Sequence, residues 1–166
     1  MTQEILQDLE PTDLPPEHPV RAVDAYWREL AAGTGIPTRE VFNPLRVPAA
    51  LPWLYLFERL PSGTGDEPCT TQEDYVLILF GASTLSDGGK LAAGMRLSEL
   101  FSGPLLERRL DEFARVHREA APVLSRTFIT GGPRPGNWVR GLFPFRSAAG
   151  TPQVLVVMIP DLNPAS

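Results

Sequence analysis

The sequence predicts a single α+β domain in which helices flank a central antiparallel sheet. Two strand-like segments, 53–60 and 74–80, lie in the middle of the chain, and three more, 123–130, 138–146 and 153–159, fill its last third. Amphipathic helical patterns precede the first pair and the final three, so strands and helices are segregated along the chain. The length of 166 residues suits one domain, and a hydrophobic content of 43% is enough for one core.

The first 18 residues are expected to form a loosely held acidic arm. Prolines recur from Pro11 to Pro19 and interrupt any helix there. The folded domain is therefore expected over 19–161, with a short tail over 162–166. Residues 1–20 hold five acids and no base, and these acids are Glu4, Asp8, Glu10, Asp13 and Glu17.

The first helix is expected over 19–32, because apolar residues recur there at spacings of three and four. Gly33 and Gly35 then end the helix. Two interpretations of its apolar stripe remain open. The stripe packs on the sheet of its own chain, which we favour, with a homodimer through the same area in addition, or it is presented to a second subunit instead. It comprises Val20, Val23, Trp27 and Leu30.

The segment 74–80 gives the strongest strand signal, since it is apolar on both faces and is followed by Gly81. Small residues over 82–101 indicate short helical turns. The longest helix is expected over 103–120, where charges of both signs cover all but one face. Its apolar stripe consists of Leu106, Leu110, Phe113 and His117.

Composition excludes several classes of protein. A balance of 15 basic against 20 acidic residues gives a net charge of −5, which argues against nucleic-acid binding through a basic face. No apolar run is long enough to cross a membrane, and the acidic N-terminus has no signal-peptide pattern, so we expect a soluble cytoplasmic protein. The single cysteine, Cys69, excludes an intramolecular disulfide.

Catalytic signatures are missing from the sequence, and we expect a protein that is not an enzyme. There is no nucleophile elbow, phosphate-binding loop, dinucleotide fingerprint or paired-histidine zinc motif. The two histidines, His18 and His117, lie far apart in the chain. A small enzyme with a hydrophobic cavity is the least favoured interpretation.

Four segments together resemble a family of small stand-alone bacterial PAS-like proteins over residues 20–161. These segments are YWRELAAGTGIPTREVFNPLRVPAALPWLYLFE, DYVLILFGAS, MRLSELF and GLFPFRSAAGTPQVLVVM. Their order and spacing carry the resemblance. The sequence departs from the family pattern at Leu77 and Ile78, where a basic residue is common, and at Arg140 and Gly141, which interrupt an apolar strand.

The resemblance implies a five-stranded antiparallel sheet that cups a ligand against helices, and a role in sensing or protein contact. The resulting hypothesis is a non-enzymatic sensory or regulatory PAS module that binds a small ligand or a signalling partner protein. The alternative is a ligandless adaptor that docks a signalling enzyme through its sheet edge or its first helix. The cofactor stays unknown, because the motifs of haem-binding and flavin-binding PAS domains are not matched.

Candidate ligand-binding residues come from the last helix and strands. Alternation along 138–146 places Trp138, Arg140 and Leu142 on one side, which the resemblance turns toward the cavity. An inward Arg140 needs an internal acid or an anionic ligand; the alternative leaves it solvated. Ser125 and Thr127 share one face of the neighbouring strand and either add hydroxyls to the pocket or face water.

Phe113 and His117 are the candidates from the helix. By resemblance to haem-binding PAS sensors, His117 would be the residue to ligate haem iron. Alternatively, it is an imidazolium that interacts with the carbonyl end of its own helix.

Overall fold

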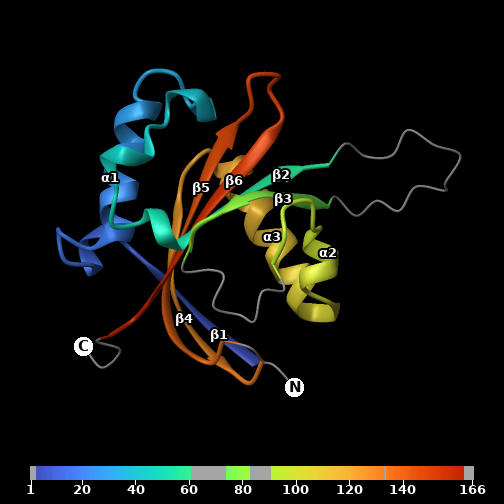
Figure 1. The fold of residues 1–166 in the computed structure, drawn as a ribbon. Helices are drawn as coiled ribbons and strands as arrows, with labels where there is room; N and C mark the ends of the chain where they lie inside the picture. The colour runs from blue at the N-terminus through green and yellow to red at the C-terminus, as the bar shows by residue number, and fades with distance from the viewer. Residues whose placement is uncertain (1–2, 61–73, 83–90, 133, 163–166) are drawn as a thin grey trace, which may run out of the picture.

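The computed structural model describes residues 3–60, 74–82, 91–132 and 134–162. Cys69, with the whole predicted connection 61–73, and residues 83–90 lie outside these ranges. The chain forms an α+β fold with a six-stranded, fully antiparallel sheet in the order β1-β4-β5-β6-β2-β3. Helix α1 covers one face of the sheet, and α2 and α3 cover the other (Figure 1).

Five of the strands lie where the apolar runs predict them, within two residues at each end. Strand β4 coincides with the predicted 123–130. The central pairing of β5 with β6 sets Leu142 opposite Val156 and so fixes which side chains share a face. The bounds are β2 Leu54–Arg59, β3 Tyr75–Phe80, β4 Val123–Thr130, β5 Gly136–Arg146 and β6 Pro152–Pro160.

The sixth strand, β1 (Gln3–Leu9), corrects the expectation of a loosely held N-terminal arm and of a five-stranded sheet. It pairs with β4 along its whole length, from Gln3 opposite Thr130 to Leu9 opposite Leu124, and forms one edge of the sheet (Figure 1). The sequence pattern did not predict this strand, because its acidic residues are typical of a solvated arm. Their partners are arginines about one hundred residues away in the chain. Arg115 Nη1 lies 3.2 Å from Asp8 Oδ2, and Glu4 is buried.

Helix α1 (Pro19–Ala31) confirms the first predicted helix. The ring of His18 caps its start, with Nδ1 accepting a hydrogen bond from the Val20 amide at 3.1 Å. Trp27 is 4% exposed and donates from Nε1 to the Pro144 carbonyl oxygen at 2.7 Å, which ties the helix to β5.

The apolar stripe of α1 packs on the sheet of its own chain, as the first interpretation had it. Val20 and Val23 are fully buried and Leu30 is half-buried in the same cluster. Val20, Val23 and Trp27 are thus enclosed within one molecule, and a homodimer interface through Val20, Val23, Trp27 and Leu30 stays a prediction.

Between α1 and β2 the chain forms short 3-10 turns, as expected from its closely spaced prolines. Each turn is three residues long, so none builds a helix over the sheet. The turns are Arg39–Val41, Pro44–Arg46 and Leu51–Trp53.

Helices α2 (Leu97–Leu100) and α3 (Gly103–Glu119) lie over the opposite face. Helix α3 matches the predicted helix, and α2 lies within the segment expected to hold short helical turns. Phe113 and Val116 project from α3 into a second apolar cluster, where they meet Leu142 of β5. The sheet thus separates two cores, and only the α3 side contains the site described next.

Candidate functional site

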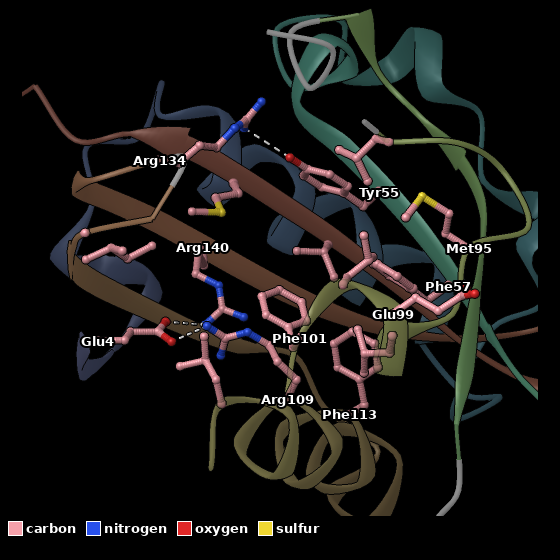
Figure 2. A pocket seen from close by; sticks show the side chains of 18 residues that line it. Glu4, Tyr55, Phe57, Met95, Glu99, Phe101, Arg109, Phe113, Arg134 and Arg140 are labelled. Atoms are coloured by element: carbon pink, nitrogen blue, oxygen red, sulfur yellow. Dashed lines mark hydrogen bonds and ion pairs between the residues drawn. The ribbon is translucent and has the colours of Figure 1, made fainter. Parts of the chain in front are cut away.

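A pocket of about 620 Å³ lies between α2, α3 and the sheet. Its walls are mainly apolar, and charged side chains gather at its end near β1 (Figure 2). A volume of this size falls in the range of small-molecule sites in proteins. The aromatic and aliphatic wall residues include Tyr55, Phe57, Leu97, Leu100, Phe101, Leu105, Phe113, Val156 and Met158.

Aromatic rings form the floor of the pocket where α3 meets the sheet. Phe113 is 1% exposed, and its ring centroid lies 5.4 Å from that of Phe57 and 4.9 Å from that of Tyr75. The contact with Tyr75 is edge-to-face, an arrangement that aromatic quadrupoles favour. This packing fixes the rings and gives the pocket a preformed apolar surface.

A buried cluster of four ionic side chains closes the end near β1. Arg109 of α3 forms ion pairs with Glu4 of β1 and, at 3.0 Å, with Glu112 of its own helix. Arg140 of β5 lies 2.9 Å from Glu112 and 3.7 Å from Glu4. Figure 2 shows both guanidinium groups turned toward the Glu4 carboxylate. Three separate elements, β1, α3 and β5, therefore meet at this cluster.

The charges in the cluster balance. Burial raises the pKa of Glu112, but the guanidinium groups of Arg140 and Arg109 outweigh it, so the net pKa is lowered and the carboxylate is ionised. Burial and the neighbouring Arg140 lower the pKa of Arg109, yet arginine stays charged in proteins. Paired charges of this kind avoid the cost of an isolated buried ion.

Arg140 has the inward orientation that the resemblance implies, and it is only 3% exposed. The alternative of a solvated Arg140 is wrong, because acids on α3 and β1 neutralise it inside the protein. Leu142 shares this face, but it packs in the core and lines a second cleft, between α3 and β1.

Ser125 and Thr127 of β4 lie on the same face of the sheet as Arg140, but neither lines the pocket. Thr127 is fully buried and donates from Oγ1 to Glu4 Oε1 at 2.8 Å, so it supports the ionic cluster. Ser125 lines the cleft between α3 and β1, and its buried Oγ has no hydrogen-bond partner among the described residues. Both residues are buried, which corrects the alternative in which they face water.

Trp138 lies near the start of β5 and is half-buried. Its Nε1 donates to the Arg134 carbonyl oxygen at 3.2 Å, and the Arg134 guanidinium lies 5.6 Å from its ring centroid. Arg134 itself lines the pocket and donates from Nη1 to the Tyr55 hydroxyl at 3.1 Å. Trp138 itself does not line the pocket; it contacts Arg134, which does.

His117 lies outside the set of pocket-lining residues, so the structure does not bring it together with the other candidates. Its Nε2 lies 2.8 Å from the Gln153 carbonyl oxygen, and since a carbonyl only accepts, Nε2 carries the proton. Burial lowers the pKa of His117, and the charges of Arg146 and Arg59 lower it further. A neutral ring bonded to β6 corrects the alternative of an imidazolium at the end of its own helix.

Phe113 and Arg140 are thus the candidates that line the pocket. Sequence reasoning missed Glu4, Arg109 and Glu112, because charged residues on an arm and on a mixed-charge helix are usually solvated. One signal was present for Arg109: it lies four residues before Phe113 and therefore on the buried face of α3.

No family model, curated protein or solved structure matches the chain. Among the described residues, no group of three or more His, Cys, Asp or Glu side chains is placed to hold a metal ion. In the same ranges, every helix is too short or too polar to cross a membrane.

Proposed function

We propose that this protein is a PAS-like sensory or regulatory module that binds a small ligand without transforming it. The observation that carries the proposal is the pocket of about 620 Å³ between the sheet, α2 and α3, which has apolar walls and a charge-balanced polar end. A ligand enclosed there touches both helices and the centre of the sheet at once.

The order of elements supports the PAS-like part of the proposal. Strands β2 and β3 form a hairpin, helices α2 and α3 follow, and β4, β5 and β6 form a meander. These five strands are contiguous in an antiparallel sheet whose one face, with the helices, encloses the pocket. This is the arrangement that the sequence resemblance implies, with β1 added at one edge.

The ionic cluster offers a physical route from ligand to signal. Arg109 and Arg140 line the pocket, and both interact with Glu4 of the edge strand β1. A ligand that contacts these guanidinium groups changes the surroundings of Glu4 and thereby the attachment of β1. In this proposal, the exposed sheet edge reports occupancy of the pocket to a signalling partner.

Native mass spectrometry of the full chain, purified under mild conditions, tests ligand binding. We expect a mass above the 18.2 kDa of the polypeptide, and release of the bound molecule on denaturation. Leu105→Trp places an indole in the pocket wall and is expected to reduce the bound fraction sharply. Leu45→Trp makes the same change at a site that is 76% exposed and should leave the bound fraction unchanged.

The ligandless adaptor makes the opposite prediction. A bare polypeptide mass for the unmodified chain, persisting after incubation with a small-molecule extract of the expressing cells, would contradict the proposed function. Equal loss of bound mass in both tryptophan variants would show that binding does not occur in this pocket.

A further inference from the structure

The pocket's charges and hydrogen bonds indicate which chemical class of ligand it accepts. Resting on the proposed function, we propose that the ligand is an uncharged, largely aromatic molecule with a hydrogen-bond acceptor oxygen, which a guanidinium group of Arg109 or Arg140 binds. A ketone, ester, lactone or amide carbonyl on a flat apolar body has this chemistry.

The charge balance argues for an uncharged ligand. The buried cluster at the end of the pocket holds two guanidinium groups, from Arg109 and Arg140, and two carboxylates, from Glu4 and Glu112. Two positive charges therefore meet two negative ones where a ligand would contact the cluster. A charged ligand leaves one charge uncompensated in a mostly apolar enclosure, which is costly.

The remaining hydrogen-bonding capacity argues for an acceptor on the ligand. A guanidinium group has five N–H donors. Within the described residues, the side-chain hydrogen bonds of Arg109 and of Arg140 start from Nη1 and Nη2 alone. The carboxylate of Glu4 already accepts from Thr127 and Arg109, and that of Glu112 from Arg109 and Arg140. An acceptor oxygen therefore fits this end better than a donor.

The aromatic walls argue for a flat apolar body. Tyr55, Phe57, Phe101 and Phe113 line the pocket, and ring–ring contact favours aromatic ligands beyond simple burial of area. The Arg109 guanidinium carbon lies 5.3 Å from the Phe101 ring centroid, at the boundary between the apolar walls and the ionic cluster. One molecule can thus stack on the rings and reach the guanidinium groups with an oxygen.

Four probes of matched shape test the ligand class by equilibrium dialysis against the full chain, with detection by naphthalene absorbance. They are 2-acetonaphthone, 2-naphthoate, 2-(aminomethyl)naphthalene and 2-ethylnaphthalene. We expect 2-acetonaphthone to bind most tightly, roughly tenfold better than either charged probe. It should bind roughly fivefold better than 2-ethylnaphthalene, which lacks the acceptor oxygen. Leu105→Trp should weaken uptake, and Leu45→Trp should not.

The outcomes separate this inference from the proposed function. Tightest binding of 2-naphthoate, 2-(aminomethyl)naphthalene or 2-ethylnaphthalene, blocked by Leu105→Trp, overturns the ligand class and leaves a ligand-binding pocket in place. No uptake of any probe, with a bare mass in native mass spectrometry, overturns both.

A charge variant provides a second, independent readout. Glu4→Gln keeps the shape of the side chain and leaves the cluster with one surplus positive charge. We expect it to raise the affinity for 2-naphthoate relative to 2-acetonaphthone by roughly tenfold. Glu17→Gln, at an exposed position, is the matched control and should leave this ratio unchanged. An unchanged ratio in folded Glu4→Gln, verified by circular dichroism, would overturn the argument from charge balance.

Discussion

Replacing Glu4 by alanine is expected to lower the free energy of unfolding by about 3 kcal/mol, the scale for removing one partner of a buried ion pair. The Glu4 side chain is 1% exposed and interacts with Arg109 and Arg140, which are themselves buried. Its loss leaves one surplus positive charge inside the protein, and the Thr127 hydroxyl keeps only its longer contact, 3.3 Å, with the Ile5 carbonyl oxygen. Urea denaturation followed by circular dichroism measures the change.

Glu17→Ala is the control for this measurement, because Glu17 is an exposed acid in the same N-terminal region. It should change the free energy of unfolding by less than about 0.5 kcal/mol. If both variants shift the denaturation midpoint by the same small amount, β1 is not held by the ionic cluster. That result would support the expectation that the N-terminal residues form a loosely held arm.

Replacing Trp27 by alanine is expected to destabilise the protein by about 3–5 kcal/mol, as large-to-small changes of buried aromatic residues do. The indole is 4% exposed between α1 and the sheet, and its Nε1 donates to the Pro144 carbonyl oxygen at 2.7 Å. Thermal and urea denaturation give the loss. Trp27→Phe, which keeps much of the volume but lacks the donor, should cost about 1–2 kcal/mol.

Glu29→Ala provides the matched comparison on the same helix, since the Glu29 side chain is 64% exposed. Its effect should stay within about 0.5 kcal/mol, because a surface ion pair such as that with Arg46 contributes little. A loss for Trp27→Ala no larger than that for Glu29→Ala would contradict the packing of α1 on its own sheet.

Local sequence pattern predicted most of the elements, because each has either a periodic apolar face or a short apolar run with clear ends. In helix α1, the buried Val20, Val23 and Trp27 recur at spacings of three and four. Strand β6 is instead a run of five consecutive buried residues, 153–157, and Pro160 ends the strand. The α+β class followed from the order of these elements.

Strand β1 was not predictable in the same way, because its stability comes from distant parts of the chain. Glu4 and Asp8 are typical of a solvated arm when they are read locally. Only the folded sheet brings Arg109, Arg115 and Arg140 next to them. Compensation between charges about one hundred residues apart leaves no periodic signal in the sequence.

The site was predicted only in part for a related reason. Alternation along β5 gave the two possible sides for Arg140, and the resemblance selected the inward one. Which acid of α3 pairs with Arg140 depends on how that helix is rotated about its axis over the sheet. The mixed charges along α3 do not specify this rotation. The same rotation turns Phe113 into the pocket and sets His117 against Gln153.

A crystal structure of the full chain grown with 2-acetonaphthone tests the central claim most directly. We predict continuous density for the naphthalene rings against Phe57 and Phe113, with the ketone oxygen within hydrogen-bond distance of Arg109 or Arg140. A pocket closed by collapse of α2 onto the sheet, with the probe excluded, would contradict the claim that this protein encloses a small ligand.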